Sequence, residues 1–158
     1  MKARMNYYPQ FSEAFAKLNE IEGLLQHSTL DKHLTHLVKL RASQINGCHF
    51  CIDLHVKQAR KDEERELRLY HLSTWHESSL FSDKEKAALK WTEVLTRLSS
   101  QDVSDEIYQA TREHFNEKEI TELTMAVALI NMWNRFGVSF KSTAGSMDKA
   151  LGVENVKL

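Results

Sequence analysis

Apolar residues recur at three- and four-residue spacing along most of the chain, which is the periodicity of an amphipathic α-helix. The first such stretch begins at Pro9 and ends near Gln26, and its apolar positions are Phe11, Ala14, Phe15, Leu18, Ile21 and Leu25. One proline and five glycines in 158 residues allow long uninterrupted helices. No convincing stretch shows the period-two alternation of a half-buried strand, so the pattern predicts an all-α fold.

The second helix is predicted to be capped by Ser28 or Thr29, with Asp31 in its first turn. Its apolar side chains follow one face as far as Ile45, where Asn46-Gly47 supplies a turn. The helix that follows this turn carries both cysteines of the chain.

Three later helices begin at recognisable caps. Ser82 opens a capping box, Ser104 caps the next helix, and Asn116 caps the last long one. The whole pattern predicts a bundle of about six to seven helices in one domain spanning residues 1–158. The cysteine pair lies at the N-terminus of a central helix.

Two stretches carry weaker patterns. Residues 62–71 are predicted to form a short helix anchored by Leu67 and Leu69. The tail at 142–158 has little periodicity, so we expect it to pack loosely or against a neighbouring subunit.

The cysteine helix carries the candidate chemistry. If it begins just after Asn46-Gly47, one helical stripe holds Cys48, Cys51, Ile52, His55 and Ala59. The first turn of a helix leaves N–H groups unpaired and carries the positive end of its dipole, which favours thiolate over thiol. Cα atoms at i and i+3 lie roughly 5 Å apart, a spacing that a disulfide can bridge. The pattern indicates a redox dithiol with a neighbouring imidazole.

Composition narrows the setting of this chemistry. A net charge of −1 and a pI near 6.7 give no electrostatic basis for binding nucleic acid or an anionic membrane. The first residues lack the apolar stretch of a signal peptide, and no apolar run approaches the length of a membrane span. The expected compartment is the cytoplasm, where a cysteine pair is more often catalytic or metal-binding than structural.

The run from Leu37 to Cys51, read as LVKLRASQINGCHFC, together with His55 resembles the alkylhydroperoxidase AhpD core of the carboxymuconolactone decarboxylase family. Weaker similarity extends the match over about residues 30–140, through Trp75, the segment 81–88 and the run from Asn131 to Arg135. The resemblance implies an all-helical fold that assembles into a hexamer (a trimer of dimers), a trimer or a dimer. It also implies a thiol peroxidase that reduces hydroperoxides and is re-reduced by a dithiol protein or small thiol, with no cofactor.

Site roles follow from this resemblance position by position. Cys51 matches the peroxidatic cysteine that attacks the peroxide, and Cys48 matches the resolving cysteine and proton donor. His55 matches the histidine of the proton relay. One position departs: twelve residues before the first cysteine, where the family usually has a relay glutamate, this chain has His36. An imidazole moves protons near neutral pH, so His36 is a candidate relay residue.

Other interpretations of the same residues stay open. Glu64 or Glu77 would be alternative sources of the missing carboxylate. Cys48, Cys51, His55 and His36 would also form a Cys2His2 set of the kind that binds zinc. The family's lactone decarboxylase branch and a non-catalytic redox sensor are further alternatives. The remaining histidines are expected to be surface or half-buried residues.

Overall fold

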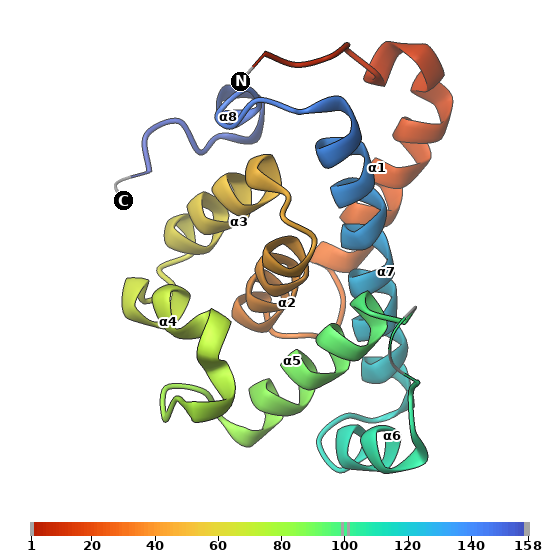
Figure 1. Cartoon of the computed structure of the whole chain (residues 1–158), viewed down its shortest axis with the longest axis vertical. Helices are drawn as coiled ribbons and strands as arrows, with labels where there is room; N and C mark the ends of the chain where they lie inside the picture. Colours follow the sequence, from red (N-terminus) through yellow and green to blue (C-terminus); the bar gives the residue numbers. More distant parts are fainter. Residues whose placement is uncertain (1, 99, 101, 157–158) are drawn as a thin grey trace.

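The computed structural model describes residues 2–98, 100 and 102–156, and in these residues every regular element is helical. A 3₁₀ turn, η1, precedes the first helix and a second, η2, follows the fourth. The elements are η1 (Tyr8–Phe11), α1 (Ser12–Gln26), α2 (Lys32–Ile45), α3 (His49–Lys61), α4 (Glu66–His71), η2 (Leu72–Glu77), α5 (Asp83–Thr96), α6 (Asp105–Arg112), α7 (Glu117–Phe140) and α8 (Asp148–Leu151). The predicted all-α bundle is confirmed, with α2 at its centre (Figure 1).

Helix starts follow the capping signals of the sequence in three of four cases. Ser82 and Asn116 form complete capping boxes with Glu85 and Glu119, and the Ser104 side chain accepts the Ile107 N–H. Each side chain satisfies a backbone donor that the helix itself leaves unpaired.

The predicted cap of α2 is wrong. Asp31 is the N-cap, and its carboxylate accepts the N–H groups of His33 and Leu34. Thr29 instead donates its backbone N–H and its hydroxyl to Glu122 on α7. A tertiary contact therefore occupies one of the two residues predicted as caps.

α2 packs against α3, α5 and α7, and two apolar clusters meet on it. One joins α2 to α5 and α7 through Leu34, Val38, Trp91 and Leu123, and Phe115 belongs to the same cluster. The other lies between α2, α3, α4, η2 and α5, and its members are Leu37, Leu40, Ala59, Leu69, Leu72, Trp75, Phe81 and Leu89. Leu69 anchors α4 as predicted, whereas Leu67 is exposed because it lies on the opposite side of this short helix.

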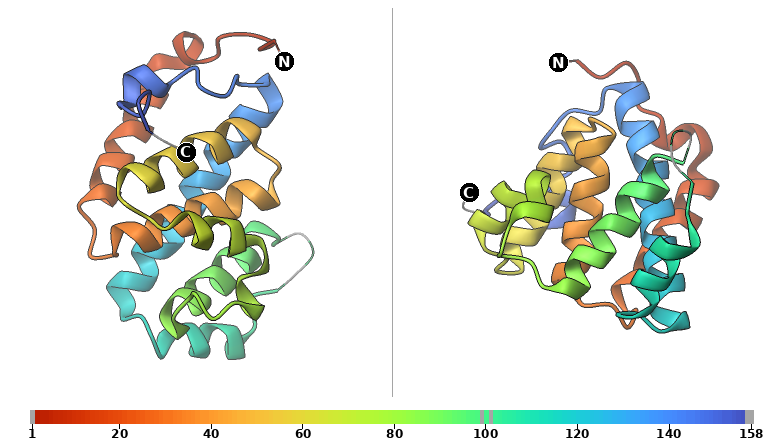
Figure 2. Two further views of the ribbon diagram at one scale, coloured as in Figure 1. Left: turned by 90° about the vertical axis from the view of Figure 1, so that its left-hand side faces the viewer. Right: turned by 60° about the horizontal axis from the view of Figure 1, so that its bottom comes forward.

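The C-terminal segment lies along α3, so the expectation of a loosely packed tail is wrong (Figure 2). The backbone N–H of Gly145 donates to Asp53 at 3.0 Å, and Lys57 bridges Asp53 and Asp148 at 2.8 and 2.7 Å. Val153 is fully buried. Polar contacts with Asp53 and Lys57 hold this segment against α3, and hydrophobic periodicity cannot indicate contacts of that kind.

No helix within the described ranges combines the length and apolar character needed to cross a membrane.

Candidate functional site

The site forms where α2 turns into α3. Gly47 has a φ of 64°, a left-handed conformation that glycine adopts without steric cost, and it lets the chain reverse within three residues. The N–H of Cys48 then donates to the Ser43 carbonyl at 3.0 Å, which ties the start of α3 to the end of α2. α2 and α3 thereby form an antiparallel pair with the cysteines at its closed end.

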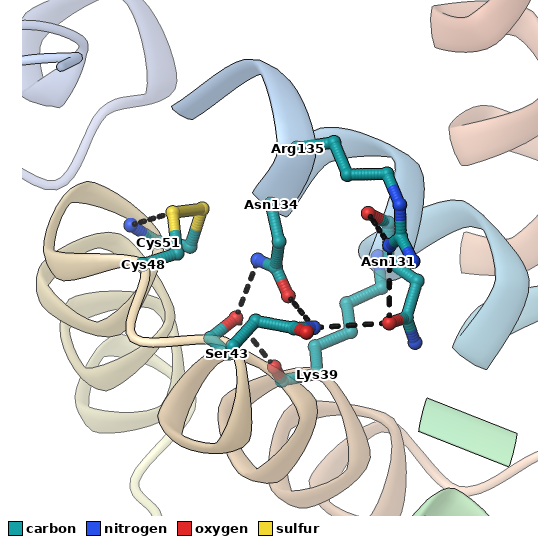
Figure 3. Close-up of a disulfide and its surroundings, with 8 residues drawn as sticks. Lys39, Ser43, Cys48, Cys51, Asn131, Asn134 and Arg135 are labelled. Carbon is teal, nitrogen blue, oxygen red and sulfur yellow. Dashed lines mark hydrogen bonds between the residues drawn. A yellow bond between two sulfur atoms is a disulfide. The ribbon is translucent and has the colours of Figure 1, made fainter. Parts of the chain in front are cut away.

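Cys48 and Cys51 are joined by a disulfide, with Cα atoms 5.3 Å apart as expected from the helical spacing (Figure 3). Cys48 is the N-cap of α3 rather than a first-turn residue, and its Sγ accepts the N–H of Cys51 at 3.3 Å. The two residues are only 1% and 3% exposed. An oxidant or reductant therefore needs a local opening of the structure to reach either sulfur.

The wall facing the disulfide is the backbone of α7 at Gly137. A Cβ built on this glycine would lie 2.7 Å from the Cys48 Sγ and 3.3 Å from the Cys51 Sγ. Real Cβ atoms essentially never approach a sulfur to 2.7 Å. Because glycine has no side chain, α7 leaves room at Gly137 for the two sulfur atoms. The sequence pattern did not predict this role of Gly137.

A buried amide network holds the turn against α7 (Figure 3). Asn46 donates to Asn131 and Asn134 at 2.9 and 2.8 Å, and Asn134 donates to the Ser43 hydroxyl at 3.0 Å. The Ser43 hydroxyl in turn donates to the Lys39 carbonyl. Buried amides that are fully paired fix one arrangement of the surrounding backbone. The sequence contained these residues in its matched runs, but not their pairing.

His55 is buried one turn beyond Cys51, on the same face of α3. Its Nδ1 lies 2.8 Å from the side-chain amide oxygen of Gln58, which can only accept a hydrogen bond; the tautomer that satisfies this contact carries its hydrogen on Nδ1 and leaves Nε2 as the basic nitrogen. Burial, with a further contribution from the positive charge of Lys39, lowers the pKa of His55 to about 3. With the disulfide closed, His55 is therefore a neutral imidazole at physiological pH and offers no imidazolium to Cys51.

His36 lies on α2 and contacts Asp62 rather than a cysteine. Its Nε2 is 2.7 Å from Asp62 Oδ2, and the pair lies at the far end of the α2–α3 seam from the disulfide. Neither alternative carboxylate is placed to substitute for it. Glu64 is buried against Arg68, and the side chain of Glu77 is 84% exposed beside His76.

The residues of the alternative zinc set are not gathered at one point. The two sulfurs are bonded to each other, and His36 is paired with Asp62. Among the residues that the structure describes, no three or more His, Cys, Asp or Glu side chains are grouped to hold a metal ion. The geometry is that of a dithiol–disulfide pair beside a buried imidazole.

A helical bundle with a CxxC disulfide at the start of a central helix is typical of one family of proteins. The model of the carboxymuconolactone decarboxylase family matches residues 9–94, and the chain belongs to that family, with its AhpD-like core. The uncharacterized protein YdfG of Bacillus subtilis (strain 168) is 38% identical over 146 residues, which cover 92% of this chain and 99% of YdfG.

Solved structures share the fold. A protein of unknown function from Agrobacterium tumefaciens, described as a candidate antioxidant defence protein AhpD, is 39% identical with a TM-score of 0.87. The match covers 90% of this chain and 98% of that one. The debrominase Bmp8 superposes with a TM-score of 0.75 at 14% identity, covering 90% of this chain and 76% of its own. This last similarity concerns the fold alone.

Proposed function

We propose that this protein is a thiol peroxidase that reduces hydroperoxides through a Cys48–Cys51 dithiol–disulfide cycle. The observation that carries the proposal is the pairing of the two sulfurs at the N-cap of α3, with a buried imidazole one turn further along. The similarity to an AhpD-like protein of A. tumefaciens supports the same chemistry.

The cycle balances with the residues present. The Cys51 thiolate attacks one peroxide oxygen, so that an S–O bond forms and the O–O bond breaks. The departing alkoxide takes a proton and leaves as an alcohol, while Cys51 becomes a sulfenic acid. Cys48 then attacks the Cys51 sulfur, which closes the disulfide and releases water. A dithiol donates two electrons to restore both thiols.

The structure offers different support to each cysteine. Cys48 receives the Cys51 N–H, which stabilises negative charge on the Cys48 sulfur. Cys51 is the sulfur nearer to His55 along the helix, and Nε2 of that residue is the nitrogen able to accept a thiol proton. We assign attack on the peroxide to Cys51, because His55 can take the proton of its thiol and the resemblance places the attacking cysteine there. The N–H that Cys48 accepts supports Cys48 as the thiolate that then attacks the Cys51 sulfenic acid and closes the disulfide.

The cellular partners belong to the same proposal. They are a hydroperoxide, a dithiol protein or small thiol in the cytoplasm, and further copies of this chain. Several large apolar side chains project to solvent from α1 and α7, as a self-associating protein requires, among them Leu24, Met125 and Met132. Light scattering should give a multiple of 18.3 kDa, with the hexamer expected; a monomer at micromolar concentration would contradict self-association.

Peroxide-consumption kinetics test the function. Purified protein with excess dithiothreitol should consume cumene hydroperoxide and hydrogen peroxide catalytically, and Cys51→Ser should abolish this. Gly23→Ala, which alters a glycine of α1 with no atom within 4 Å of the added Cβ, is a matched control and should leave the rate unchanged. The proposal fails if no peroxide is consumed above the background of dithiothreitol alone. Release of bromide from a bromopyrrole in a parallel assay would point to dehalogenation instead.

A further inference from the structure

Phe50 lies between the two cysteines in the first turn of α3, and its ring shares their surroundings. A Cβ built on Gly137 would lie 2.7 and 3.3 Å from the two sulfurs, and 4.0 Å from Cδ1 of Phe50. One point on the surface of α7 therefore has both sulfurs and the aromatic ring as near neighbours. The ring is half-buried, whereas the sulfurs are almost completely enclosed, so Phe50 lies between the disulfide and water.

Other sides of the disulfide are bounded by groups that hydrogen bonds hold in place. On the side towards α2, Asn134 donates to the Ser43 hydroxyl and accepts from Asn46 (Figure 3). On the side of α7, the wall is helical backbone at Gly137. Movement of either wall breaks hydrogen bonds. The ring of Phe50 is apolar, and it turns about two side-chain torsions without breaking any.

The outer side of Phe50 adjoins the C-terminal segment. This segment begins beside the disulfide, because the Ser142 N–H donates to the Gly137 carbonyl at 3.0 Å. It then follows the side of α3 on which Phe50 lies, against Asp53, Lys57 and Lys61. Phe50 therefore occupies the end of this side of α3 that is nearest to the sulfurs.

The chemistry of the site requires direct contact with a sulfur atom. The thiolate of a reductant bonds to one sulfur of the disulfide, while the other leaves as a thiolate and takes up a proton; a second thiol then displaces the first and frees both cysteines. A peroxide oxygen likewise has to reach the Cys51 sulfur. Rotation of the Phe50 ring opens a path for either reactant at the lowest cost in hydrogen bonds.

We propose that Phe50 determines access and specificity at this site. Its ring covers the two sulfurs, turns aside to admit a reactant, and offers an apolar surface to the organic group of a hydroperoxide. Apolar contact of that kind is favourable because it removes both surfaces from water. The choice of an organic hydroperoxide rests on the proposed function, whereas control of access to the disulfide stands without it.

The first measurement is the rate at which dithiothreitol reduces the oxidised full-length protein, read by thiol alkylation and mass spectrometry. Phe50→Ala removes the cover and should raise this rate by a factor of about ten. Phe50→Tyr keeps the ring and should react at nearly the wild-type rate. His49→Ala is the matched control, because it truncates an exposed neighbour in the same turn, and it should leave the rate unchanged.

A loss of global stability also exposes a disulfide, so the urea dependence of the reduction rate separates the two causes. Rotation of one ring exposes little surface, and the rate in Phe50→Ala should hardly depend on urea below the unfolding transition. Leu123→Ala destabilises the core roughly 21 Å along α7 from Gly137 and should keep the wild-type rate without urea. An unchanged rate in Phe50→Ala, or an equal rise in Leu123→Ala, would overturn the inference.

Peroxide selectivity tests the apolar surface. The ratio of kcat/KM for cumene hydroperoxide to that for hydrogen peroxide should fall in Phe50→Ala, because the small peroxide gains from the opening while the organic one loses the ring. The ratio should stay at the wild-type value in His49→Ala. An unchanged ratio in Phe50→Ala would contradict the role in specificity. If the wild-type protein consumes no peroxide, the proposed function fails, and control of access is decided by the dithiothreitol rates.

Discussion

Gly137→Ala tests whether the absence of a side chain at this position of α7 makes room for the disulfide. In the oxidised protein the new Cβ would lie 2.7 Å from the Cys48 Sγ, so either α7 or the disulfide must shift. Overpacking of this kind costs about 1–3 kcal/mol. Alanine is also favoured over glycine inside a helix by about 1 kcal/mol. The oxidised protein should therefore lose roughly 0–2 kcal/mol of net unfolding free energy.

The reduced protein should respond differently because its sulfurs are not tied to each other. The Cys48 side chain can rotate away from α7, so the gain from helix propensity is retained while most of the overpacking is relieved. A difference of about 1.4 kcal/mol between the two states raises the reduction potential by about 30 mV. Gly137→Ala should thus be more easily reduced than the wild type.

Equilibration with dithiothreitol or glutathione redox buffers, read by thiol alkylation and mass spectrometry, measures this displacement. Gly23→Ala is the matched control, since its Cβ meets nothing within 4 Å. It should stabilise both redox states by up to about 1 kcal/mol and leave the potential unchanged. A potential for Gly137→Ala equal to that of Gly23→Ala would refute the argument that Gly137 provides the space for the disulfide.

Three further changes test other parts of the structure. The pKa of His55 is about 3 in the oxidised protein, against 6.5 for an ordinary histidine side chain. The unfolded chain therefore binds more protons, and stability falls as pH drops from 6.5 towards 3. Urea unfolding should show a loss of about 3 kcal/mol between pH 7 and pH 4 that is absent in His55→Gln, and equal losses in both proteins would contradict the burial argument. Asn134→Ala should cost about 2–4 kcal/mol because it leaves Asn46 and Ser43 short of a partner, and a loss below 1 kcal/mol would show that the amide network is dispensable. Asp31→Ala should lower the unfolding free energy by about 1 kcal/mol while Ser28→Ala has little effect, and the reverse order would restore the cap predicted from sequence.

Local signals in the sequence predicted the local parts of the fold. The capping boxes at Ser82 and Asn116 depend on residues three positions apart, and the stripe that joins Cys51 to His55 depends on helical spacing alone. Such features need no knowledge of the partner helix. This is why the all-α class and the position of the cysteine helix were predictable.

Features that depend on distant segments were not predictable in this way. Gly137 reaches the disulfide from nearly ninety positions downstream, and no periodicity marks that encounter. Asp62 lies at the end of α3 with no sequence signal for a partner, yet the pairing of α2 with α3 brings it to His36. Ser28, Thr29 and Asp31 are all good caps by residue type, and the contact of Thr29 with the distant Glu122, which local sequence does not indicate, removes one of the two predicted caps.

The assignment of the attacking sulfur is tested most directly by a single-turnover experiment on Cys48→Ser. One equivalent of hydrogen peroxide should convert Cys51 to a sulfenic acid, which dimedone traps as an adduct located by peptide mass spectrometry. Cys51 should still undergo this one rapid oxidation, but no turnover should follow with a dithiol. An adduct on Cys48 of the Cys51→Ser protein, formed at the wild-type rate, would contradict the account and make Cys48 the attacking residue.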